Sequence, residues 1–141
     1  MEKQVMRRRS DPRVLVMCLV GVCLFLSASS LAHHSFSAEF DVGRPVQFTG
    51  SVVEIEWTNP HAWVHIEAKD EKGNRQRWAV ELVGINALMR TGFNRKTVKI
   101  GHALTVSGFG ARNGTNTANA AYVMRTDTNK VLWATAGFSP D

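Results

Sequence analysis

The chain has only two cysteines among its 141 residues, Cys18 and Cys23, and both lie near the amino terminus. From residue 33 onward there is no thiol, so this part of the chain has no disulfide, no thiolate metal ligand and no cysteine nucleophile. Long apolar runs are also lacking, because the longest extends only from Val14 to Leu26 and a transmembrane helix needs ~20 residues. The sequence therefore argues against a disulfide scaffold and against a stable membrane anchor.

The amino-terminal residues have the order of a secretory signal. A charged stretch, MEKQVMRRRSDPR, precedes the apolar run, and the small-residue segment SASSLA follows it. Ser30 and Ala32 are small residues at the positions that signal peptidase requires, which predicts cleavage before His33. We favour the general secretory route over the twin-arginine route, because a polar Ser-Asp-Pro sequence follows arginines 7–9. The mature protein is therefore expected in the periplasm or outside the cell.

Charge is nearly balanced once the predicted signal is set aside. Residues 1–32 hold 5 of the 17 basic residues and 2 of the 12 acidic residues, which leaves 12 and 10. Nucleic-acid binding needs a clustered basic face, so a nucleic acid is not an expected partner. The remaining ~109 residues are enough for one domain with a single core.

Short alternating runs separated by turn residues begin at Val46, a pattern typical of an all-β barrel or sandwich. The first run, VQFTGSVVEIEW, contains Gly50, where a bulge or sharp bend can curve a long strand. The second run, HAWVHIEA, alternates strictly, and its expected core face comprises Ala62, Val64, Ile66 and Ala68. Its other face carries His61, Trp63, His65 and Glu67. After a polar loop at 70–74, RQRWAVELV predicts a third strand with Trp78, Val80 and Leu82 inward.

A short helix is expected at INALMRTGF, because Ile85, Leu88 and Met89 have helical spacing and Gly92 can end it. Strands are expected at HALTVSGFG, with Leu104 and Val106 inward, at ANAAYVMRT and at VLWAT. Three strands, a short helix and further strands are the order of the five-stranded oligonucleotide/oligosaccharide-binding (OB) barrel.

The predicted fold is therefore an all-β, OB-fold-like barrel of five to six strands with one short helix, and a generic β-sandwich is the alternative. The predicted organisation is a signal peptide at 1–32, an extended segment at 33–45, the barrel at 46–135 and a tail at 136–141.

Several stretches together resemble a family of exported bacterial proteins that is known only as a domain of unknown function. They are HHSF at the expected mature start, the WTNPHAW block and the NTANA stretch. The resemblance covers residues 33–135 and implies an exported, periplasmic protein of Gram-negative bacteria. It implies no activity.

The histidines are the strongest candidates for chemistry. An amino-terminal His33 offers its α-amino nitrogen and ring Nδ1 as a chelate, and one further imidazole would complete a nitrogen site suited to copper. The segment from residue 33 to 45 is long enough to bring this end to the Asn59-Pro60 turn, where His61 lies. His34 offers a competing site through the amine, an amide and its own ring. His65 lies ~13 Å from His61 along a strand, so the two cannot bind the same metal unaided.

The WTNPHAW block also predicts a binding surface, with Trp57, Asn59, His61 and Trp63 as its candidate residues. The two tryptophans flank a turn, and aromatic side chains on such barrels often stack on ligands. No serine lies in a nucleophile-elbow pattern, and nothing marks two of the strand glutamates as an acid–base couple.

The sequence thus favours a non-enzymatic binding module for a small ligand or an envelope protein partner. The alternative is a copper-binding protein that uses His33 and His61.

Overall fold

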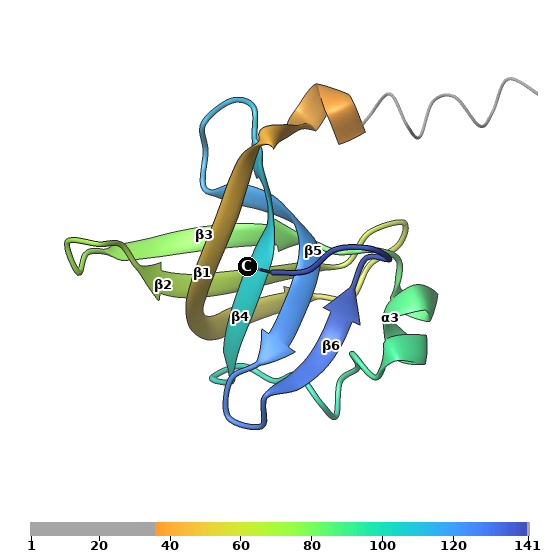
Figure 1. Ribbon diagram of the computed structural model, residues 1–141. Coiled ribbons are helices and arrows are strands. Elements are labelled where there is room, and N and C mark those ends of the chain that lie inside the picture. Colours follow the sequence, from red (N-terminus) through yellow and green to blue (C-terminus); the bar gives the residue numbers. More distant parts are fainter. Residues whose placement is uncertain (1–35, 141) are drawn as a thin grey trace, which may run out of the picture. The chain divides into compact units, whose positions relative to one another are not determined.

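The computed structural model of the protein describes residues 36–140 (Figure 1). Within this range the elements are β1 (Phe40–Glu56), β2 (Trp63–Lys69), β3 (Arg75–Glu81), α3 (Ile85–Thr91), β4 (Ala103–Ala111), β5 (Thr117–Arg125) and β6 (Lys130–Ala134). The predicted order of three strands, a short helix and further strands is confirmed.

The strands form a single sheet in the order β3-β2-β1-β4-β5-β6, in which neighbouring strands are antiparallel. A parallel pairing of β3 with β5, from Ala79 opposite Thr117 to Glu81 opposite Asn119, closes the strands into a ring. The predicted class, an all-β fold of five to six strands with one short helix, is confirmed. The closure also places the end of β3 directly beside the start of β5.

Strand β1 is longer than the sequence predicts, because it begins at Phe40 and not at Val46. Its first part pairs with β4 across an irregular register between Phe40 and Pro45, and its second part pairs with β2. Because of this irregularity, the first residues of β1 lack the alternating pattern by which a strand is recognised in the sequence. Figure 1 shows β1 bending between its two partners. At the bend only glycine fits, because a Cβ on Gly50 would lie 2.4 Å from the carbonyl oxygen of Glu67.

The core lies inside the ring and follows the predicted alternation. Ala62, Val64, Ile66, Val80, Leu82, Leu104 and Val106 are all buried. Trp78 differs from the prediction, because it is only half-buried at the margin of the core and stacks on Phe48 with ring centroids 4.4 Å apart. Burial of a large apolar side chain stabilises a fold by ~1.5–3 kcal/mol, so this cluster dominates the stability of the ring.

Helix α3 begins and ends where the sequence predicts. Gly92 follows it with φ of 90°, a left-handed conformation that glycine adopts without strain and that ends helices. Leu88 is fully buried, whereas Met89, which was expected on the same apolar face, is 58% exposed. The helix has only seven residues and lies beside β6 (Figure 1), where Thr91 Oγ1 donates a hydrogen bond to the Leu132 carbonyl at 2.6 Å. Leu88 is therefore the one residue of α3 that is buried in the core.

Between residues 36 and 140, no helix combines the length and the apolar character needed to cross a membrane.

Candidate functional site

The predicted binding residues lie in and beside the connection between β1 and β2, residues 57–62. The Asn59-Pro60 bond in this connection is cis. The side chain of Asn59 accepts a hydrogen bond from the backbone N–H of Ile85 at 3.3 Å, and Thr58 Oγ1 donates to the His61 carbonyl at 2.8 Å. The turn is thus anchored to the start of α3, and the Asn59 amide oxygen is engaged in that anchoring.

The two tryptophans of the block line separate pockets. Trp57 borders a pocket of about 410 Å³ beside α3, together with Met89 and Arg95. Its ring packs edge-on against the buried Phe93, with centroids 5.8 Å apart, and the Arg95 guanidinium lies 5.1 Å from the ring centroid. Trp57 is therefore part of the packing around the core, and the single aromatic surface expected from the sequence is divided in two.

Trp63 borders a larger pocket of about 520 Å³ at the other side of the connection. The walls combine the buried ring of Phe40 with the connection between β4 and β5. The residues that line the pocket besides these two aromatics are Ala38, Glu39, Ala111, Arg112, Asn113, Thr115 and Thr117. A half-buried indole faces hydroxyl, amide and guanidinium groups there. Ligand pockets commonly combine apolar walls with a few oriented polar groups in this way.

Next to this pocket, the side chain of Glu81 is buried at the end of β3. Glu81 lies opposite Trp63 in the β2–β3 pairing, and its side chain is 7% exposed. One carboxylate oxygen forms an ion pair with Nδ1 of His61, and the other accepts a hydrogen bond from the Asn119 amide at 3.2 Å. The His61 side chain is 49% exposed. A buried carboxylate thus holds a half-exposed imidazole through its Nδ1 atom.

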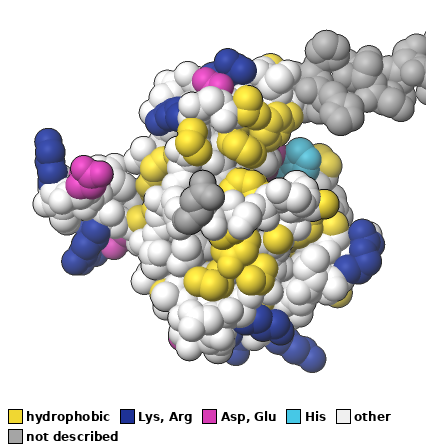
Figure 2. Space-filling view, in the orientation of Figure 1, with side chains coloured by type: hydrophobic (Ala, Val, Ile, Leu, Met, Phe, Trp, Pro, Cys, Tyr) yellow, Lys and Arg dark blue, Asp and Glu magenta, His cyan; other side chains and the backbone are white. Residues whose placement is uncertain are grey.

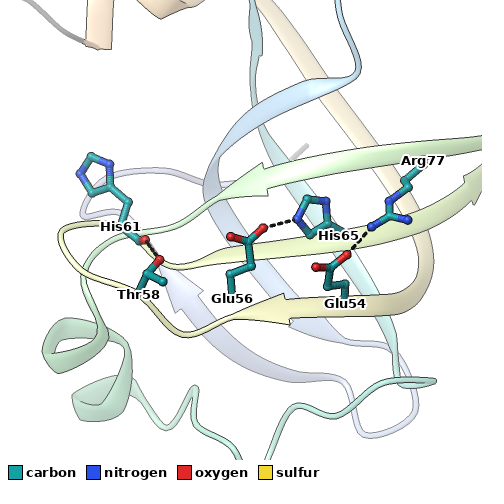
Figure 3. A network of polar contacts seen from close by, with 6 residues as sticks. All are labelled: Glu54, Glu56, Thr58, His61, His65 and Arg77. Atoms are coloured by element: carbon teal, nitrogen blue, oxygen red, sulfur yellow. Dashed lines mark hydrogen bonds and ion pairs between the residues drawn. The ribbon is translucent and has the colours of Figure 1, made fainter.

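A second histidine–glutamate pair lies on β1 and β2 (Figure 3). Nε2 of His65 lies 2.7 Å from Oε1 of Glu56, and the Arg77 guanidinium binds Glu54 beside it. The His65 side chain is 18% exposed and that of Glu56 is 46% exposed, the reverse of the first pair. Figure 3 shows the His61 ring directed away from this group.

The burial of Glu81 is the feature that sequence reasoning missed. The alternation of β3 puts Trp78, Val80 and Leu82 inward, so Glu81 was expected at an exposed position. It is buried because the parallel pairing of β3 with β5 brings Asn119 against it, and because His61 covers it. No short-range signal in the sequence reports that contact.

Lysine and arginine side chains are spread over several separate places on the face shown in Figure 2, with hydrophobic side chains between them. This view shows no continuous basic patch of the kind that follows a nucleic-acid backbone.

The predicted metal ligands His33 and His34 lie outside the described residues, so their part in a site stays a prediction. His61 is described, and its environment is the pair with Glu81.

The ring of strands, the short helix and the pocket at Trp63 define a small all-β protein with a concave surface at one end of β2. Its sequence matches the model of a family of unknown function, DUF6152, over residues 22–120, and the chain belongs to this family. The family resemblance expected from the sequence is thereby confirmed. No curated protein matches the sequence.

Proposed function

We propose that this protein is an exported, non-enzymatic binding module of the cell envelope whose binding surface is the Trp63 pocket. The observation that carries the proposal is the pocket of about 520 Å³ between β2 and the β4–β5 connection. In OB folds, which share this element order, ligands bind on strands 2 and 3 and on the loops at this end of the sheet. A similar fold alone does not establish a binding site, so the proposal rests on the pocket itself. The secretory pattern of residues 1–32 supports export.

The pocket suits a small, partly polar ligand that stacks on an indole. Neutral oligosaccharides are the first probe, because tryptophan faces and amide and hydroxyl groups are the contacts that sugars use on such folds. Trp63 provides the stacking face, while Asn113 and Thr117 provide hydrogen-bonding groups in the wall.

Chemical-shift mapping with maltotetraose tests the proposal on the full chain. We expect shifts at the Trp63 indole and in residues 112–117, and their loss in Trp63→Ala with an unchanged fold. Trp57→Phe is the matched control, because it alters the other pocket and should leave these shifts in place. Binding that persists in Trp63→Ala, or shifts confined to the Trp57 pocket, would contradict the proposal. No shift at any residue with this probe or with a panel of short oligosaccharides would also overturn the sugar assignment.

The geometry of His61 favours copper binding as a second function. Metal-ligating histidines almost always donate their other ring N–H to a carboxylate or carbonyl, which fixes the ring orientation. Glu81 contacts Nδ1 of His61 in this manner and leaves Nε2 as the ligand atom. The mature amino terminus, if cleavage occurs before His33, would supply the remaining nitrogens. Copper binding at this place would put a metal at the edge of the Trp63 pocket.

Copper(II) titration of processed protein, with spin resonance and amino-terminal sequencing on the same sample, tests this second function. We expect a three-nitrogen signal at substoichiometric copper, and a loss of about 10–100-fold in affinity on Glu81→Gln, the usual cost of removing such a partner. Glu67→Gln, on the exposed face of β2, is the matched control and should have no effect. Equal affinities in the two variants would contradict the role of His61.

A further inference from the structure

A β-bulge sets the positions of the two glutamates beside His65. The register of β1 against β2 shifts between Val52 and Glu54, so that Val52 lies opposite Ile66 and Glu54 lies opposite His65. Bulges re-aim the side chains that follow them, and they occur often near functional sites. Here the bulge keeps Val52 in the core while Glu54 and Glu56 both reach the outer face next to His65.

The three side chains form a cluster of metal-ligating atoms. One carboxylate oxygen of Glu54, one of Glu56 and a ring nitrogen of His65 all lie within 4.8 Å of one another. Ligand atoms on a tetrahedral zinc are ~3.4 Å apart, given bonds of ~2.0–2.2 Å. Both carboxylates are about half exposed, so small rotations of their side chains close the difference.

The imidazole is the fixed member of the cluster. Its side chain is largely buried on β2 and its Nε2 already points at Glu56. Figure 3 shows the His65 ring with Glu56 on one side and Glu54 below it, next to Arg77. A ligand that is held in place before the ion arrives loses less conformational entropy on binding than a free side chain does.

The positive charge next to the cluster is the guanidinium of Arg77. This guanidinium is bound to Glu54, and the side chain is 58% exposed. Surface pairs of this kind are worth about 0–1 kcal/mol, so a divalent ion can displace Arg77 from Glu54 at little cost.

We propose that Glu54, Glu56 and His65 bind one Zn²⁺-class transition metal ion, with Arg77 as the competing cation. One nitrogen and two oxygen donors suit zinc, whereas calcium and magnesium prefer oxygen ligands alone. The ion lies between Nε2 of His65 and the carboxylates, and the neutral ring then carries its proton on Nδ1. Water fills the remaining positions, because the cluster provides three protein ligands among the residues that the structure describes. The three donors differ from His61 and Glu81, and none of them lines the Trp63 pocket, although Glu56 lies opposite Trp63 in the β1–β2 pairing. The proposal therefore does not rest on the function proposed for that pocket.

Zn²⁺ calorimetry on the full chain carrying C18S, C23S, H33A and H34A tests the proposal, because these changes remove the other strong donors before residue 36. We expect one zinc ion to bind with micromolar affinity. His65→Ala should weaken binding at least about tenfold, since it removes the nitrogen ligand. Arg77→Gln should strengthen binding about fivefold, because it removes a positive charge a few ångströms from the ion.

His102→Ala and His61→Ala are the matched controls, and both should leave the zinc affinity unchanged. Far-UV dichroism of each variant shows whether it is folded, and Glu56→Gln provides a second ligand variant if His65→Ala is not. The proposal is overturned if zinc does not bind, if His65→Ala and Glu56→Gln bind as tightly as the parent, or if Arg77→Gln binds no more tightly.

Discussion

The two histidine–glutamate pairs of this protein have the same chemistry and opposite burial. In the first pair the carboxylate of Glu81 is buried and the imidazole of His61 is half-exposed. In the second pair the imidazole of His65 is the more buried partner and the carboxylate of Glu56 is half-exposed. In the first pair a buried carboxylate holds a half-exposed imidazole, whereas in the second a more buried imidazole lies close to two half-exposed carboxylates. The same two residue types therefore support an oriented single ligand in one place and a three-atom cluster in the other.

The largest expected effect is on the free energy of unfolding of Glu81→Ala. This change removes a buried carboxylate and leaves the amide of Asn119 and Nδ1 of His61 without their acceptor. We expect a loss of about 1.5–3 kcal/mol, the range for hydrogen bonds to a charged group. Urea unfolding measures it. A loss no greater than that of Glu56→Ala would contradict the difference between the pairs.

A smaller effect is expected in the second pair when its imidazole is removed. His65→Ala takes a largely buried ring from the outer face of β2 and should cost about 1 kcal/mol, since packing as well as the contact with Glu56 is lost. His61→Ala should cost more, because it leaves the buried Glu81 carboxylate without its ion-pair partner. Urea unfolding of both variants under one set of conditions tests the order, and the reverse order would contradict it.

Glu56→Gln should change stability by no more than about 0.5 kcal/mol. Exposed pairs contribute little because water and salt screen them. Denaturation in low and high salt is the measurement, and any loss seen at low salt should disappear at high salt. A salt-independent loss above about 1 kcal/mol, the upper end for an exposed pair, would show that Glu56 is held as firmly as Glu81 and would remove the contrast between the pairs.

The smallest effect is expected at a partly exposed carboxylate outside both pairs, where it appears as a change in the pH dependence of stability. Hydrogen bonds from the backbone N–H and the amide side chain of Asn74 lower the pKa of Asp70 in the β2–β3 loop. A lowered pKa in the folded state means that the stabilisation is present above the unfolded-state pKa near 3.8 and is lost as pH falls through the folded value. Asp70→Asn should therefore flatten the acid side of the stability curve. An unchanged slope at pH values below the unfolded-state pKa would contradict this.

The sequence pattern predicted most of the local structure. Strict alternation in HAWVHIEA placed the core face of β2 correctly, and Gly92 ends α3 where expected. Both signals are local, since each depends only on residues that are a few positions apart in the sequence. The first residues of β1 were missed because their pairing with β4 contains an irregularity that breaks the alternation between Phe40 and Pro45.

The site was predictable only in part, for the same reason. The sequence identified the WTNPHAW block, and the structure places His61 and Trp63 at one end of β2 beside a pocket. It did not identify Glu81, whose burial requires the pairing of β3 with β5. Nor did it connect His65 with Glu54, because a bulge in β1 determines which residue lies opposite the ring. Contacts made across strands distant in sequence decide both cases.

The difference between the two pairs is tested most directly by a long-range ¹H–¹⁵N spectrum of the imidazole rings, recorded before and after one equivalent of Zn²⁺. The protein is the full chain with the four upstream cysteine and histidine substitutions. We predict that His61 carries its proton on Nδ1 throughout, while the Nε2 resonance of His65 moves when zinc is added. A His61 ring with its proton on Nε2, or a His65 resonance that zinc leaves in place, would contradict the difference between the pairs.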